Sequence, residues 1–292
     1  MEKLLHWSIA NAQGDKEAIA KAGQPDPRLL QQLFGGAGSS GPDDPTLMKE
    51  QMEVIMNPDV ELDIKLVAID NFEMLIENLD NANNIENLKL WDPILKILEF
   101  EEDELVSQAL SIIGTSVQNN TNSQDKFLKH ENGLNKVIQL ANDKSQSFEV
   151  RTKALYALSN LVRNHEHMAT KFRELNGLDI IPPILNDPKA KTKLKMRAIA
   201  LLTAFLTSTE ISESLISDMR KDGTIEATID CLNSETDLNL IDRVLNLLAQ
   251  LISAGIKFNQ VEMEKLKTGF QKVEPLKDRL NEDDYLTVKY VL

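Results

Sequence analysis

The amino-acid sequence predicts an all-α fold, namely a right-handed α-solenoid of about four to five three-helix repeats that follows a flexible N-terminal arm. Composition is the first observation: 42% of the residues are hydrophobic but only 5% are aromatic, which favours packing of aliphatic helices over a β-sandwich. An internal repeat and a tract rich in Gly, Ser and Pro are the second and third. The length of 292 residues suits a repeat array, because its core is a continuous seam between stacked helices.

The first 45 residues differ from the rest and are predicted to form a flexible arm. Residues 4–21 can form a short amphipathic helix, which a segment rich in Gly and Pro at 23–27 ends. The tract at 35–45, rich in Gly, Ser and Pro, is typical of a tether. Two apolar clusters lie in this polar arm: Leu4, Leu5, Trp7 and Ile9 form the first, and Leu29, Leu30, Leu33 and Phe34 form the second.

From residue 46 to residue 292 the chain carries a helical pattern with an internal period. A small residue or Val followed by a branched apolar residue recurs in steps of 41, 45, 44 and 46 residues, beginning at Ala68. A second marker keeps a similar step, because Leu90-Trp91 is followed by glycines at 133, 177 and 223. Two independent markers at one period are typical of helical repeats of the ~40–47-residue class.

Each unit divides into three helices, which is the armadillo arrangement. In one unit a short polar helix at 125–130 is expected to end at Gly133, a natural helix stop. A second helix is expected from 134 to 140 and a third from 149 to 164, after a polar turn. The third helices of an armadillo solenoid line its concave groove, so their outward side chains are the expected binding surface.

The expected groove residues recur at fixed positions of the third helices. With Asn160 as the groove marker, the positions seven before and four after it share its face at helical spacing. A basic row in a chain of net charge −14 favours contact with an acidic partner, although basic side chains also occur on ordinary solvated faces. The leading position carries Lys153, Arg197 and Arg243 in three neighbouring repeats, and the trailing position carries Asn78, Asn119 and Asn164 in the first three.

A polar segment at residues 81–84 follows the first of these third helices. We expect it to form a turn in which Ala82 and Asn84 approach the partner, whereas the alternative is a plain helix N-cap. Nuclear-import receptors of the armadillo class thread extended peptides along a recurrent Asn. This chain has that Asn once, at Asn160, which argues against such a receptor.

Several other function classes lack support in the sequence. The net charge of −14 disfavours nucleic acid and anionic lipid, and no segment approaches the ~20 apolar residues of a membrane helix. The single cysteine, Cys231, is expected to be buried filler and fits a reducing, cytoplasmic compartment. A G-x-G-x-x-G match at 36–41 precedes Pro42 and is taken as linker. His165 and His167 point apart at a solvated helix end, so we expect no metal, no cofactor and no catalytic residue.

Several segments resemble one family. The run 151–161 resembles the armadillo third-helix consensus. The fungal Fes branch of the heat-shock-protein-70-binding family is similar to three tracts: MEKLLHWSIAN at 1–11, DNFEMLIENLDNANN at 70–84 and KLKMRAIALL at 193–202. The resemblance spans nearly the whole chain. It implies nucleotide exchange on the ATPase domain of a heat-shock protein 70 (DnaK-type) chaperone, with an arm whose apolar clusters look like client peptides. We also expect the chain to be a monomer.

Two other classes of function stay open at this point. A static armadillo scaffold or peptide adaptor would bind its partner without changing the partner's chemistry. An enzyme is the third class, and no constellation of residues supports it. An exchange factor needs no catalytic residue, because differential affinity for two conformations of the partner is sufficient.

Overall fold

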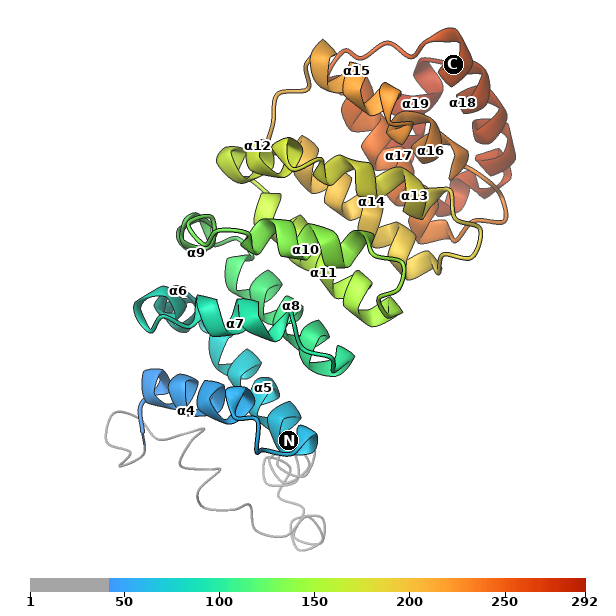
Figure 1. Ribbon diagram of the computed structural model, residues 1–292. Helices are drawn as coiled ribbons and strands as arrows, with labels where there is room; N and C mark the ends of the chain where they lie inside the picture. The colour runs from blue at the N-terminus through green and yellow to red at the C-terminus, as the bar shows by residue number, and fades with distance from the viewer. Residues whose placement is uncertain (1–41) are drawn as a thin grey trace, which may run out of the picture. The chain divides into compact units, whose positions relative to one another are not determined.

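The computed structural model describes residues 42–292, and the chain divides between Asp43 and Asp44. The two apolar clusters of the predicted arm lie outside the described residues. Within Asp44–Leu292 the helices follow one another in a stack that runs in chain order (Figure 1). No β-strand occurs among residues 42–292.

Four three-helix units form the middle of Asp44–Leu292, each with two short helices and a longer third helix. They are α6 (Leu79–Asn87), α7 (Trp91–Ile97) and α8 (Asp103–Val117); α9 (Thr121–Phe127), α10 (Gly133–Asn142) and α11 (Phe148–Val162); α12 (Glu166–Glu174), η1 (Gly177–Ile180) with α13 (Ile181–Leu185), and α14 (Thr192–Leu206); and α15 (Glu213–Lys221), α16 (Thr224–Asp230) and α17 (Leu238–Ser253). The helices α4 (Asp44–Met56) and α5 (Leu62–Ile76) precede them, and α18 (Gln260–Val273), η2 (Glu274–Arg279) and α19 (Glu282–Tyr290) follow. The predicted α-solenoid of about four to five three-helix repeats is confirmed.

The third helices form the spine of the solenoid. Helix α5 packs on α8, α8 on α11, α11 on α14, α14 on α17, and α17 on α19. The small residues of the sequence marker are buried in these helices, since Ala109, Ala154 and Ala198 are each 0% exposed. Helices α8 and α11 approach closely at Gly114, where a Cβ would lie 3.2 Å from the Cα of Ala157. The repeat marker therefore records a buried position of the third helix.

The short polar helix of the second unit differs from its predicted bounds of 125–130. Helix α9 begins earlier because the Asn120 side chain accepts a hydrogen bond from the backbone N–H of Ser123 at 3.3 Å. The residue that turns the chain before the next helix is Asn132, with φ of 63°, and not Gly133. The expectation that Gly133 stops the helix is wrong, because Asn tolerates the left-handed conformation well enough to take that role.

The marker glycines serve close packing in two repeats and backbone conformation in a third. Asn176 takes the left-handed turn in the third unit, and a Cβ on the following Gly177 would lie 2.3 Å from the Phe172 ring. Only Gly223, with φ of 83°, uses the conformational freedom of glycine at this point of the repeat. One periodic sequence signal thus has two physical causes.

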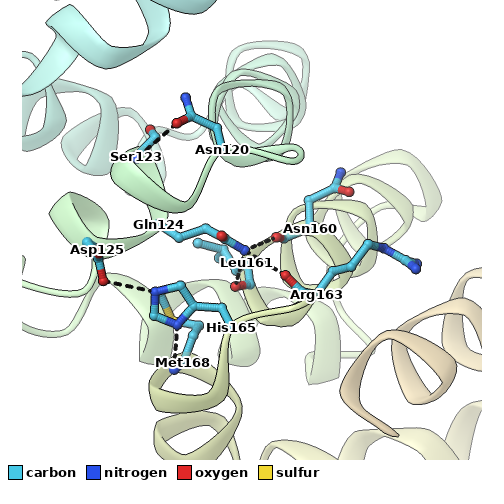
Figure 2. A network of polar contacts seen from close by, with 9 residues as sticks. All are labelled: Asn120, Ser123, Gln124, Asp125, Asn160, Leu161, Arg163, His165 and Met168. Carbon is cyan, nitrogen blue, oxygen red and sulfur yellow. Dashed lines mark hydrogen bonds and ion pairs between the residues drawn. The ribbon is translucent and has the colours of Figure 1, made fainter. Parts of the chain in front are cut away.

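A polar network joins the second and third units (Figure 2). The Nε2 atom of Gln124, on α9, lies 2.9–3.0 Å from the backbone carbonyls of Asn160, Leu161 and Arg163 at the end of α11. His165 accepts a hydrogen bond from the backbone N–H of Met168 and lies 3.0 Å from Asp125. His165 is 6% exposed, so the expectation of a solvated helix end is wrong for it. These bonds fix α11 against the helices around it.

An ion pair between a partly exposed arginine and a buried carboxylate joins the fourth unit to α18. The Glu262 carboxylate is 1% exposed and accepts hydrogen bonds from Arg220 Nε at 2.7 Å and Nη2 at 3.0 Å. It also accepts the backbone N–H of Asn259 at 2.8 Å and so completes a capping box at the start of α18. The hydrogen bond that Arg220 donates to Glu262 raises the pKa of Arg220 above its ordinary value.

We predict that Glu262→Ala lowers the free energy of unfolding by about 3 kcal/mol, because it leaves the Arg220 charge without its carboxylate and removes half of the capping box. Urea unfolding followed by circular dichroism measures the loss. The matched control is Glu264→Ala, an exposed position on the same helix, which should change stability by less than about 0.5 kcal/mol. Equal losses in the two variants would contradict the role given to the ion pair.

Candidate functional site

The outward sides of the third helices make up the surface that the sequence singled out. We call it the third-helix face and define it by the partly or fully exposed residues at equivalent positions of α5, α8, α11, α14 and α17. At the leading position and at the positions three and seven residues after it, the face comprises Val67, Asp70, Met74, Gln108, Thr115, Lys153, Tyr156, Arg197, Ala200, Arg243, Asn246 and Gln250. The three residues of the predicted basic row, Lys153, Arg197 and Arg243, all lie on it: the first two are half-buried and Arg243 is exposed.

Side-chain hydrogen bonds connect the helices at the N-terminal end of this face. Lys153 Nζ donates to Ser111 Oγ at 2.9 Å, and that hydroxyl donates to Glu73 at 2.5 Å. Gln108 donates to the carboxylate of Asp70. These contacts join α5, α8 and α11, and they engage Lys153 within the chain itself.

Arg197 is held by an aromatic ring and not by a carboxylate. Its guanidinium carbon lies 5.1 Å from the centroid of the Tyr156 ring, within the range of a cation–π interaction. The Tyr156 hydroxyl in turn lies 3.4 Å from Thr115 Oγ1 and donates to Gln118 at 3.3 Å. Tyr156 therefore orients Arg197 while the N–H groups of the guanidinium stay available.

A cleft of about 440 Å³ lies where α14, α17 and α19 meet, and Arg163 and Arg243 line it. Asp242 and Asp284 also line it: Asp242 accepts a hydrogen bond from the backbone N–H of Asn281, the N-cap of α19, at 2.8 Å, and Asp284 accepts one from the side chain of Asn246 at 3.1 Å. The guanidinium groups of Arg163 and Arg243 form no hydrogen bond or ion pair with residues 42–292. Two arginines and two aspartates therefore line the cleft together, and basic residues are not in excess there.

Some basic side chains elsewhere on Asp44–Leu292 are paired with carboxylates. Arg173 pairs with Asp218, and Lys136 Nζ lies 2.5 Å from Glu99. Lys265 Nζ lies 2.9 Å from both Glu226 and Asp230. Arg163, Arg197 and Arg243 have no carboxylate partner among residues 42–292, which also holds for most other Lys and Arg residues there; Arg197 and Arg243 differ from those residues by their place on the third-helix face.

The sequence did not indicate Arg163 as a residue of this surface, although it lines the cleft beside Arg243. The helical template used positions seven before and four after Asn160, whereas Arg163 lies three after it, at the end of α11. Arg163 is the C-cap of α11 and has an extended backbone conformation, with φ of −61° and ψ of 125°, so helical spacing from Asn160 does not place its side chain.

The prediction that Asn78, Asn119 and Asn164 lie on the outward face of the third helices is wrong. Asn119 and Asn164 follow the ends of α8 and α11, where they adopt left-handed conformations with φ of 51° and 54°. Asn78 is the N-cap of α6 and accepts the backbone N–H of Asp80 at 2.8 Å. Their amides serve turns and caps, for which Asn is well suited. Asn160 does lie in α11, but it is 7% exposed.

The predicted turn at residues 81–84 is also wrong, because these residues lie inside helix α6. Ala82 is 4% exposed and so presents little surface to a partner. Asn84 is half-buried and accepts a hydrogen bond from Asn87 at 3.1 Å. The capping alternative is closer to the structure, although the capping residue is Asn78.

Residues 42–292 show no arrangement suited to bond-making chemistry at a metal or thiolate. In this part of the chain no three His, Cys, Asp or Glu side chains are grouped so that they could bind a metal ion. Cys231 is 7% exposed, and burial raises the pKa of its thiol to about 11, so the thiolate is scarce at neutral pH. None of the described helices has the length and apolar character needed to cross a membrane.

Comparison with known proteins identifies the family. Residues 1–85 match a family model described as nucleotide exchange factor Fes1, and residues 81–244 match one described as the SIL1/FES1/HPBP1 C-terminal domain. The Hsp70 nucleotide exchange factor FES1 of Saccharomyces cerevisiae is 67% identical over 293 residues, which cover 100% of both chains. The chain belongs to the Fes1 family. The Candida glabrata member of the Fes1 family is 63% identical over 100% of this chain and 99% of its own.

The fold of this Fes1-family chain also has solved counterparts. The designed armadillo repeat protein YIII(Dq)4CqI superposes with a TM-score of 0.66 over 86% of this chain and 98% of its own, at 16% sequence identity. At that identity the likeness shows the fold alone. The armadillo-like architecture and the family resemblance predicted from the sequence are both confirmed.

Proposed function

We propose that this Fes1-family chain binds the ATPase domain of a cytoplasmic Hsp70 chaperone through its third-helix face and promotes release of ADP. Full-length similarity to curated Hsp70 nucleotide exchange factors supports the activity. The observation that supports the surface is the row of basic side chains, Lys153, Arg197 and Arg243, at equivalent positions of the third-helix face on a chain of net charge −14. A monomer without catalytic residues is sufficient for this function.

Exchange follows from differential binding. The chain lowers the affinity for ADP if it binds the opened, nucleotide-free form of the ATPase domain more tightly than the closed form. Linkage requires that ADP weaken the complex by the same factor by which the complex weakens ADP binding. A static scaffold, the alternative function, binds both forms equally and leaves ADP affinity unchanged.

The arginines suit an acidic surface of the partner. A guanidinium presents paired N–H donors that match the two oxygens of a carboxylate, and it keeps its charge at any physiological pH. Tyr156 holds Arg197 in place by the cation–π contact at 5.1 Å, which reduces the entropy lost on binding. Local positive charge also speeds the encounter with an acidic partner despite the negative charge of the whole chain.

We predict that Arg197→Glu and Arg243→Glu each weaken binding to the ATPase domain by about 2 kcal/mol or more, a factor of about 30, through lost pairing and new repulsion. Calorimetry measures the affinity, and stopped-flow release of fluorescent ADP measures the exchange rate, which should fall in parallel. The matched control is Arg279→Glu in η2, which makes the same change of charge at an exposed position outside the face. Wild-type affinity in the face variants, with melting temperatures unchanged, would contradict the assignment of the surface.

We also propose that the N-terminal arm occupies the peptide-binding site of the chaperone and so assists release of client protein. The sequence supports this through the two apolar clusters near Lys3 and Arg28, which resemble the extended apolar peptides that such chaperones bind. The tether keeps the clusters at high local concentration once the solenoid is bound. The alternative is that the arm is a stabilising cap, which terminal repeats generally need.

We predict that deletion of residues 1–41 preserves ADP release and the melting temperature but slows displacement of a labelled client peptide. The cut leaves Asp44 in place, whose carboxylate accepts a hydrogen bond from Asn81 at 2.8 Å and so fixes the start of α4. Fluorescence anisotropy of the peptide and differential scanning calorimetry provide the two measurements. A truncated chain that melts markedly earlier and displaces peptide normally would identify the arm as a cap.

A further inference from the structure

Exposed apolar side chains are concentrated at the N-terminal end of the third-helix face. Among the described residues eight large hydrophobic side chains are exposed, and five of these lie between Leu62 and Leu79, so they form a local concentration. Ile64, Val67 and Met74 are 54%, 61% and 56% exposed. Their spacing places all three on one side of α5. We call Ile64, Val67 and Met74 the α5 stripe.

The α5 stripe is continuous with the part of the face that carries the arginines. Asp70 and Glu73, on the neighbouring side of α5, accept hydrogen bonds from Gln108 and Ser111 of α8. The packing then continues without interruption from α8 to α11 and α14. At an interaxial spacing of 8–10 Å, the stripe lies roughly 25–30 Å from Arg197. One protein domain is large enough to cover both.

Folding does not require apolar residues at these positions. Val67 and Met74 correspond in the repeat to Gln108 and Thr115 of α8, which is a well-packed third helix with polar side chains at both sites. Exposed side chains of this size leave apolar area in contact with water, which is unfavourable. Polar residues like those of α8 at the same positions would avoid this cost. A clustered departure of this kind on a surface that binds another protein indicates contact with that protein.

We propose that the α5 stripe is the apolar anchor of the complex and receives an apolar patch on the same ATPase domain whose acidic patch faces the arginines. This inference rests on the proposed function and adds to it the chemistry of a second contact region. Buried apolar groups supply much of the energy that slows dissociation, whereas charged groups mainly govern encounter and orientation. The face thus combines an apolar end on α5 with a basic end on α11, α14 and α17.

The test replaces the stripe by the residues that the next repeat uses. Val67→Gln combined with Met74→Thr should weaken binding to an Hsp70 ATPase domain about tenfold, because two largely exposed apolar side chains lose their burial in the complex. The dependence of affinity on salt concentration should stay as in the wild type, whereas Arg197→Glu should reduce it. The matched control is Val261→Gln on α18, where the side chain is 55% exposed but lies outside the face. Val67→Gln alone serves as a second variant if the double variant melts early.

The possible outcomes separate this inference from the proposed function. Wild-type affinity of the stripe variants alongside weakened binding of Arg197→Glu overturns the inference and leaves the proposed function intact. Absence of binding by the wild-type chain overturns the proposed function. A wild-type dimer that the stripe variants dissociate, with chaperone affinity unchanged, would assign the stripe to a second copy of the chain. If the stripe variants melt at a lower temperature than the wild type only when residues 1–41 are present, with chaperone affinity unchanged, the α5 stripe would be assigned to contact with the chain's own N-terminal segment. Either this result or the dimer result overturns the inference.

Discussion

The buried seam between neighbouring third helices is the constraint on which the rest of this structure depends. A single repeat cannot bury its apolar side alone, so each third helix must pack on the next, and small residues such as Gly114 of α8 and Ala157 of α11 lie where two of them meet. That packing sets the spacing between third helices and aligns their outward positions. A side chain that occurs once per repeat therefore becomes part of an extended surface, on which distant residues can contact one partner together.

Several polar groups are committed to holding the solenoid together. Gln124 closes the end of α11, and the pair of Arg220 and Glu262 fixes the start of α18. Lys153 lies on the third-helix face and also takes part in this internal bonding, because it donates to Ser111. Arg243, in contrast, is exposed and forms no side-chain hydrogen bond within Asp44–Leu292. The face of a chain of net charge −14 therefore carries basic side chains with different structural roles.

The sequence predicted the solenoid well, because helical packing imposes a period that two markers record independently. It also placed Lys153, Arg197 and Arg243 correctly on an outward face, since all three lie within regular helices where spacing determines direction. The same spacing failed for Asn119 and Asn164, which lie just beyond helix ends, where the chain turns through a left-handed residue. Helix ends depend on capping and on contacts with other helices, and periodicity carries no information about either.

The reciprocal effect of nucleotide and exchange factor tests the central claim most directly. The measurement is the affinity of this chain for an Hsp70 ATPase domain with and without ADP, set beside the affinity of ADP for that domain with and without this chain. The account predicts that each ligand weakens the other by the same factor, well above one. Equal affinities in the presence and absence of ADP would contradict it and would show that the solenoid is a static scaffold.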